Sequence, residues 1–148
     1  MSLKERLQQD WKIALKSRDK FKAGVISMAK AAVLQVEKSG NGTVNDEKIV
    51  EILSKEVKQR RDAIEEFKKG NRQDLIDDAN AEIKILMNYL PQQLTREEIL
   101  EIVKIAVEEI GANSMKDMGK VMTAVMPKVK GRTDGKLVNQ IVKEYLND

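Results

Sequence analysis

The chain has 148 residues, of which 41% are hydrophobic and 34% charged, and its net charge is +3. This length suits one ordinary domain or two small ones and is too short for a large multilayered enzyme fold. The sequence contains neither cysteine nor histidine, which excludes disulfides, thiolate metal sites, a cysteine nucleophile and the usual neutral-pH general base. We therefore expect no cofactor and no metal site.

The N-terminal segment MSLKERLQQDWK is charged from its fourth residue, and no run of eighteen apolar residues occurs anywhere. This pattern indicates neither a signal peptide nor a membrane span. We expect a cytoplasmic protein with no membrane partner, or a protein inside an organelle from which a presequence has been removed.

Apolar residues recur at helical spacing along nearly the whole chain, and no strand pattern stands out. We predict an all-α fold, with an N-terminal antiparallel helical bundle over residues 1–92 and a small, tail-like three-helix domain over residues 93–148. The first helix has an apolar stripe at intervals of four residues, formed by Leu3, Leu7, Trp11 and Leu15. After the polar break SRDK, either a second helix starts or a kinked one continues, with Phe21 and Met28 on its apolar face.

Several residues predict where the later helices of the first part begin and end. A turn is expected over residues 38–45, because KSGNGTVN is rich in glycine, asparagine and serine. Asn45 is a suitable N-cap for a long helix that Gly70 would end, and Asn71 is a suitable N-cap for the next one. Pro91 should end that helix, since a residue before proline avoids helical dihedral angles.

Three shorter helices are predicted after Pro91. Thr95 and Glu98 have the spacing of a capping box, and the helix that they start should reach Gly111. Ser114 is expected to cap the next helix, which the sequence around Pro127 and Gly131 should stop. The last helix is expected to start at Thr133 or Asp134.

Positive charge is concentrated near the C-terminus. The segment from Lys116 to Lys136 has a net charge of +4, because its two anions are outnumbered by six cations: Lys116, Lys120, Lys128, Lys130, Arg132 and Lys136. The rest of the chain then sums to −1, which we interpret as placing the excess charge in one region. Within it, MPKVKGRTDGK (residues 126–136) is expected to connect the last two helices.

This region offers what a polyanion needs. Lys116 and Lys120 share a helix face, and Gly119 between them has no side chain to keep another backbone away. No aromatic residue lies in the window, so we expect contacts to phosphates rather than stacking on bases. The alternative is a solvated, lysine-rich connector with no ligand.

The methionines near the C-terminus and the charged segment 58–67 both have simple structural explanations. Met115, Met118, Met122 and Met126 follow one another at helical steps, which favours core packing over an adaptable protein contact. The segment KQRRDAIEEF (residues 58–67) is interpreted as a solvated helix face with pairs at Lys58–Asp62 and Arg61–Glu65. Carboxylates are plentiful, but none is marked as a buried acid/base pair and no phosphate-binding loop motif occurs, so no catalytic residues are predicted.

Four segments together resemble the YqeY family: KQRRDAIEEF, NYLPQQLTREE (88–98), GANSMKDMGKVM (111–122) and MPKVKGRTDGKLVNQIVK (126–143). That family is similar to the C-terminal helical and tail region of the B subunit of the tRNA-dependent glutamyl/aspartyl amidotransferase. The resemblance implies a two-part helical fold whose second half is like the tail that contacts the tRNA elbow. A similar module is appended to some glutaminyl-tRNA synthetases.

Carried over by position, the resemblance implies these RNA-binding residues: Lys116, Gly119, Lys120, Lys128, Lys130, Arg132, Gly135 and Lys136. Thr123 departs from the family pattern where glycine is common, and Thr133 where alanine is common. The resemblance brings no catalysis, because the amidating chemistry of the amidotransferase belongs to other domains and subunits.

We therefore predict a non-catalytic helical module that binds structured RNA, with tRNA as the first candidate. The alternative is a protein-interaction accessory of a tRNA synthetase or an amidotransferase. A third possibility is a part in carbon–nitrogen ligase activity with glutamine as amido-N donor.

Overall fold

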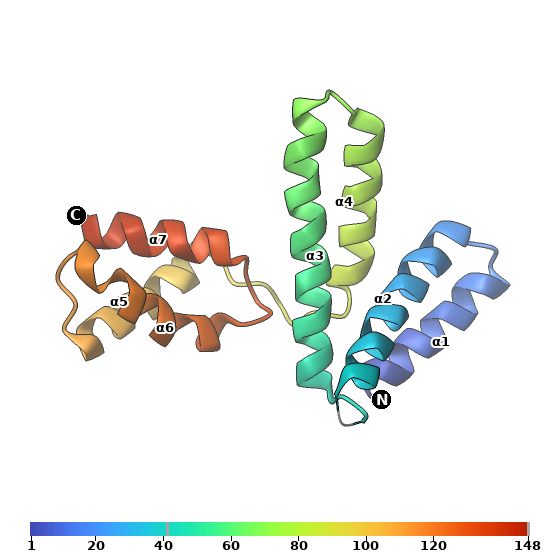
Figure 1. The fold of residues 1–148 in the computed structure, drawn as a ribbon, viewed down its shortest axis with the longest axis horizontal. Helices are drawn as coiled ribbons and strands as arrows, with labels where there is room; N and C mark the ends of the chain where they lie inside the picture. Colours follow the sequence, from blue (N-terminus) through green and yellow to red (C-terminus); the bar gives the residue numbers. More distant parts are fainter. Residues whose placement is uncertain (41, 148) are drawn as a thin grey trace. The chain divides into compact units, whose positions relative to one another are not determined.

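A computed structural model describes residues 1–40 and 42–147 (Figure 1). Over these residues it contains helices and no strand, which confirms the all-α prediction. The chain forms two compact units, Met1–Pro91 and Gln92–Asp148, each with its own apolar core. Residue 41 of the turn expected over 38–45, and residue 148 at the end of the second predicted domain, lie outside the described residues.

The polar break SRDK separates two helices, α1 (Leu3–Lys16) and α2 (Lys20–Ser39). Arg18 has φ 60°, in the left-handed region that no α-helix contains, so the chain does not continue as a kinked helix. The Asp19 side chain then accepts a 3.0 Å hydrogen bond from the Lys22 backbone N–H and caps α2. A new helix therefore starts here because the turn has both a left-handed residue and an N-cap.

The next hairpin consists of α3 (Asp46–Lys69) and α4 (Gln73–Met87). Asn45 caps α3 as predicted, accepting a 2.9 Å hydrogen bond from the Lys48 backbone N–H, and Gly70 occupies the C-cap. The prediction for Asn71 is wrong, because Arg72 holds the N-cap position of α4. Asn71 instead takes φ 54° to reverse the chain direction, a conformation that asparagine tolerates better than most residues.

The first unit is built from two antiparallel hairpins, α1–α2 and α3–α4 (Figure 1). Its core gathers buried side chains from all four helices and the turn after α4: Leu7, Val25, Ile26, Ala29, Val33, Ile49, Ile52, Leu53, Val57, Leu86 and Tyr89. Leu15 was expected on the core stripe but is 51% exposed. Each step of four residues turns about 40° around a helix, so three steps rotate Leu15 about 120° away from Leu3.

The second unit contains α5 (Arg96–Ile110), a 3₁₀ turn η1 (Met115–Asp117), α6 (Met118–Val129) and α7 (Gly135–Asn147). The predicted capping box is present, with the Thr95 hydroxyl accepting from the Glu98 backbone and the Glu98 carboxylate accepting from the Thr95 backbone. Gly111 ends α5 with φ 76°. The core of this unit comprises Ile99, Val103, Ala106, Val121, Val125, Val129, Val138, Ile141 and Val142.

As predicted, α6 ends in the sequence around Pro127 and Gly131, with Val129 as its last residue. Val121, Val125 and Val129 are fully buried at steps of four and hold this last turn against the core. Pro127 has no backbone N–H and therefore removes one intrahelical hydrogen bond from this last turn. Ser114 caps η1 rather than α6 itself, through a 3.3 Å hydrogen bond from the Lys116 backbone.

The charged segment 58–67 is only partly a solvated face. The Lys58–Asp62 ion pair is present at 2.9 Å, whereas Glu65 pairs with Lys68 instead of Arg61. The Arg60 side chain is only 11% exposed, and it contacts Glu56 at 3.2 Å and Glu82 at 3.4 Å. A residue expected at the surface thus helps to join α3 to α4.

Candidate nucleic-acid interface

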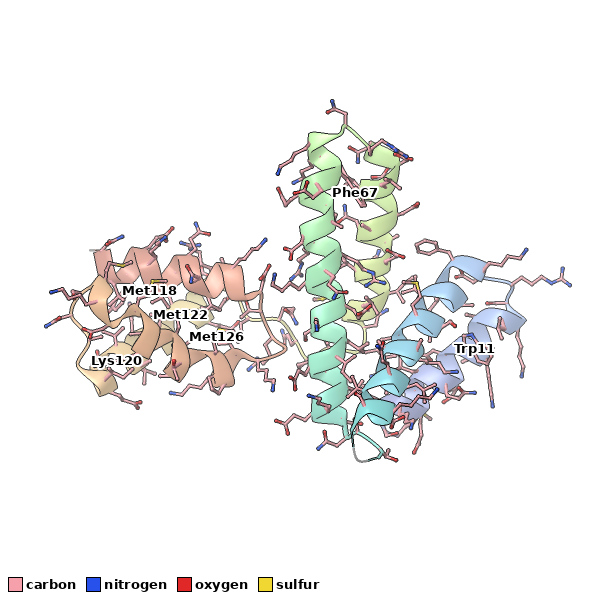
Figure 2. The ribbon with its side chains drawn as sticks, viewed as in Figure 1. Trp11, Phe67, Met118, Lys120, Met122 and Met126 are labelled. Carbon is pink, nitrogen blue, oxygen red and sulfur yellow. The ribbon has the colours of Figure 1, made fainter. Side chains whose placement is uncertain are left out.

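The predicted site residues of the second unit lie near the two ends of α6. The helix has 12 residues and is about 18 Å long at 1.5 Å per residue. Lys116, Gly119 and Lys120 lie at its start. Lys128 lies in its last turn, Lys130 and Arg132 lie in the turn that follows, and Gly135 and Lys136 lie at the start of α7. Figure 2 shows Lys120 near one end of α6 and Met126 toward the other. The cations therefore form two groups rather than one loop.

The turn between α6 and α7 is held by hydrogen bonds from the segment that precedes α5. The Leu94 backbone N–H donates to the Arg132 carbonyl at 2.8 Å, and the Gln93 side-chain amide donates to the Gly131 carbonyl at 3.1 Å. Gly131 is buried and has φ 76°, a conformation that favours glycine. The turn is therefore a fixed element that presents Lys130 at the surface.

The guanidinium of Arg132 has a structural contact. It is half-buried, and its Nε donates a 3.2 Å hydrogen bond to the Gln92 carbonyl. Hydrogen bonds from Thr95 lower the pKa of Glu98, and the nearby positive charge of Arg132 lowers it further. Arg132 thus helps to hold the turn, and this contact restricts the freedom of its guanidinium to reach a ligand.

The start of α6 presents an open backbone between two lysines. Gly119 is exposed, and a Cβ there would meet no atom within 4 Å. Lys116 and Lys120 are exposed, and no ion pair joins either to a carboxylate in residues 1–40 and 42–147. The Thr123 hydroxyl donates a 2.8 Å hydrogen bond to the Gly119 carbonyl, one turn earlier in α6. The Thr123 side chain therefore lies against the helix backbone.

The methionine series is divided between core and surface. Met118 and Met122 pack against the core of the second unit, in agreement with the core interpretation. Met126 is 37% exposed, and its terminal methyl would lie 3.7 Å from a Cβ at Gly135. A side chain at Gly135 would therefore make an ordinary van der Waals contact with Met126.

A metal site and a membrane span are both lacking over residues 1–40 and 42–147. No cluster of three or more carboxylates capable of holding a metal ion occurs among them, and no described helix is long and apolar enough to cross a membrane. A groove of about 1300 Å³ lies in the first unit, along α1 and α2. None of the predicted site residues lines it.

A model of the Yqey-like protein family matches residues 4–146, almost the whole chain. The chain belongs to the YqeY-like family. The resemblance stated from the four segments is thereby confirmed at the level of the family.

Curated relatives of this YqeY-like chain are fungal proteins named "Altered inheritance of mitochondria protein 41, mitochondrial". The protein of Pyrenophora tritici-repentis is 30% identical over 95% of this chain and 79% of its own length. That of Vanderwaltozyma polyspora is 29% identical over 95% of this chain and 80% of its length. That of Lachancea thermotolerans is 36% identical over 58% of this chain and 46% of its length.

These names overturn the expected cytoplasmic location, because they place the relatives in mitochondria. The expectation rested on the lack of an apolar run, a feature that distinguishes membrane spans from aqueous proteins but does not separate one aqueous compartment from another. None of the three names denotes an enzyme.

Sequence reasoning missed a second cationic segment in this YqeY-like chain. Residues 12–22 contain one anion, Asp19, against five cations: Lys12, Lys16, Arg18, Lys20 and Lys22. This net charge of +4 was hidden when everything outside the C-terminal window was summed together. A sliding window of about ten residues would have found it.

Proposed function

We propose that this YqeY-like protein is a non-catalytic module that binds structured RNA, with tRNA as the first candidate, through the two ends of α6 and the turn before α7. The observation that carries the proposal is the set of exposed lysines at α6, of which Lys116, Lys120 and Lys128 have no carboxylate partner in the described chain. In α3, by contrast, the exposed Lys58, Lys68 and Lys69 lie in ion pairs.

The fixed turn supports contacts to an RNA backbone. A-form RNA is recognised mainly through its shape, its phosphates and its 2′-hydroxyls. A rigid turn that presents Lys130, with Lys128 and Lys136 in the adjoining helix ends, would lose little conformational entropy on binding. The absence of aromatic residues from 116–136 also favours backbone contacts over base stacking.

The likeness to the tail of the amidotransferase B subunit adds to the proposal, because that tail contacts tRNA. The non-catalytic role rests on the lack of histidine and cysteine and on relatives whose names denote no enzyme. Purified protein should form no amide from glutamine on charged tRNA. Glutamine-dependent amide formation would refute this part of the proposal.

Binding should be measured as tRNA affinity between about 50 and about 200 mM salt, for the wild type and a Lys128→Ala, Lys130→Ala, Lys136→Ala variant. Six phosphate contacts would give a log–log salt slope near −5, and the triple variant should lessen it by about 2 to 3. Arg132 is left in place because it fastens the turn.

The matched control removes the same charge from α3, as Lys55→Ala, Lys68→Ala, Lys69→Ala, and should bind as tightly as the wild type. A flat salt dependence, or equal loss in both variants, would refute the proposal. Binding to a synthetase or amidotransferase that survives high salt would instead favour the accessory role.

A further inference from the structure

The helix α2 carries apolar side chains on its solvent side as well as on its core side. Val25, Ile26, Ala29 and Val33 pack into the core. On the exposed side, every exposed residue from 21 to 35 is uncharged, and we call this set the apolar face: Phe21, Gly24, Ser27, Met28, Ala31, Leu34 and Gln35. Phe21 is 44% exposed, and Met28 and Leu34 are each 49% exposed. Exposed apolar side chains that gather on one face often mark an interaction site.

One end of the apolar face adjoins the cationic segment 12–22, which we call the basic tip. Lys12, Lys16, Arg18 and Lys20 are exposed, and no ion pair joins them to a carboxylate over residues 1–40 and 42–147. The single acid of the tip, Asp19, already caps α2. The tip therefore has unbalanced positive charge directly beside exposed apolar surface.

The backbone at the tip has few free donors. Its N–H groups bond back to the last carbonyls of α1: Ser17 to Ile13 at 3.0 Å, Arg18 to Leu15 at 3.2 Å, and Asp19 to Ala14 at 2.9 Å. A surface that leaves water must have its backbone polar groups satisfied in this way.

From these observations we propose that the apolar face and the basic tip together dock on an anionic lipid surface. The uncharged side chains would enter the boundary between headgroups and acyl chains, while the cations contact lipid phosphates. Small residues, Gly24, Ser27 and Ala31, lie between the larger side chains of this face. The proposal departs from the expectation of no membrane partner, which was inferred from the lack of a membrane span.

The groove of the first unit extends this apolar surface toward α1. Ala31 and Leu34 belong both to the apolar face and to the groove lining, and the almost fully buried Leu7 and Val33 line it as well. Lys12 and Lys30 line the same groove, and Lys30 lies over the ring of Trp11 at 4.1 Å (Figure 2 labels Trp11). Glu5, Glu37 and Asp46 line the groove too, so the groove contributes apolar surface to the proposed contact, and the basic tip contributes the positive charge.

A second copy of the chain is a poorer occupant. Lys20 and Lys22 lie at one end of α2 and Lys38 at the other. Two copies packed face to face would therefore bring lysine ends together in either a parallel or an antiparallel arrangement, and like charges in contact are unfavourable.

The test is co-sedimentation of the full chain with vesicles of phosphatidylcholine alone, or with about 30% phosphatidylserine, at about 50 and about 200 mM salt. The wild type should bind the anionic vesicles and not the neutral ones. We expect two double variants each to weaken partitioning into the vesicles by about tenfold or more. One is Met28→Gln with Leu34→Gln, and the other is Lys16→Gln with Lys20→Gln.

Two matched controls remove similar groups elsewhere. Ile105→Gln, Ile110→Gln changes two exposed apolar residues of α5, and Lys68→Gln, Lys69→Gln changes two exposed lysines of α3; both should bind vesicles like the wild type. Circular dichroism and thermal unfolding would check that every variant is folded.

Two outcomes would overturn the proposal. One is no preference for anionic vesicles at the lower salt concentration. The other is vesicle binding that needs Lys16 and Lys20 but not Met28 and Leu34, and that RNA displaces, because this would make the tip a general polyanion contact. Neither outcome bears on the RNA site at α6, whose residues belong to the second unit.

Discussion

The hydroxyl of Tyr89 donates a 2.5 Å hydrogen bond to Oδ2 of Asp10. The two residues are 79 positions apart, and the bond joins the turn after α4 to α1. Tyr89 is only 4% exposed, and the Arg6 guanidinium lies 4.9 Å from its ring centre while donating to the Asn88 carbonyl. This contact fixes the end of the first unit, two residues before Pro91.

We expect Tyr89→Phe to lower the free energy of unfolding by about 1 to 2 kcal/mol, because it leaves the Asp10 carboxylate without its partner in a partly buried place. Urea unfolding would measure this change. Asp10→Asn and the double variant complete a mutant cycle, and a coupling near zero would show that the hydrogen bond contributes nothing.

The same contact predicts a loss of stability at alkaline pH. Burial, and then the hydrogen bond and charge of Asp10, raise the pKa of Tyr89 above its ordinary value near 10. A raised pKa contributes stability that is complete below the unfolded-state value and declines as pH rises through the folded-state value. The wild type should therefore lose more stability than Tyr89→Phe above about pH 10, in denaturant titrations at several pH values. Parallel curves for the two proteins would contradict this assignment.

At the start of α5, Thr95→Ala should destabilise the second unit by about 1 kcal/mol, because it removes the hydroxyl that caps the helix. Thr95→Ser is the matched control and should restore most of the loss. Thermal unfolding followed by circular dichroism would compare the three proteins.

Glu98 is the other half of the capping box, and we expect its contribution to stability to depend on pH in the acidic range. Hydrogen bonds from Thr95 lower the pKa of Glu98, so its contribution is present above the unfolded-state pKa and disappears as pH falls through the folded-state value. The stability difference between the wild type and Glu98→Gln should shrink below about pH 4. If the stability difference between the two proteins stays constant down to about pH 2–3, the capping box does not depend on the Glu98 carboxylate.

Two glycines of the candidate site should respond oppositely to alanine. Gly131→Ala forces a side chain onto a residue with φ 76° and should cost about 1 to 2 kcal/mol. Gly119→Ala fills open space on a helix and should stabilise it by about 0.5 kcal/mol. If RNA approaches the backbone at Gly119, the same stabilised variant should bind tRNA several-fold more weakly; unchanged affinity would remove Gly119 from the site.

The local signals in the sequence predicted helices well. Asn45 and the Thr95–Glu98 pair each act through atoms within three residues of one another, so their geometry follows from the chain itself. The family was also readable, because its four segments have a recognisable order and spacing. Asn71 was misassigned because an asparagine serves equally as an N-cap or as a left-handed residue, and only the packing of α3 against α4 selects between them.

The sequence by itself determined the helical class, the starts of α3 and α5, and the family. Tertiary structure decided which residues are available to a ligand. In the sequence Arg132 resembles the other cations, but its Nε donates a hydrogen bond to the Gln92 carbonyl. Leu15 fits the apolar stripe of the first helix, but it is 51% exposed. Residues that are near neighbours in the sequence set dihedral angles and caps, whereas exposure and charge pairing depend on side chains brought together from distant positions, as with Tyr89 and Asp10.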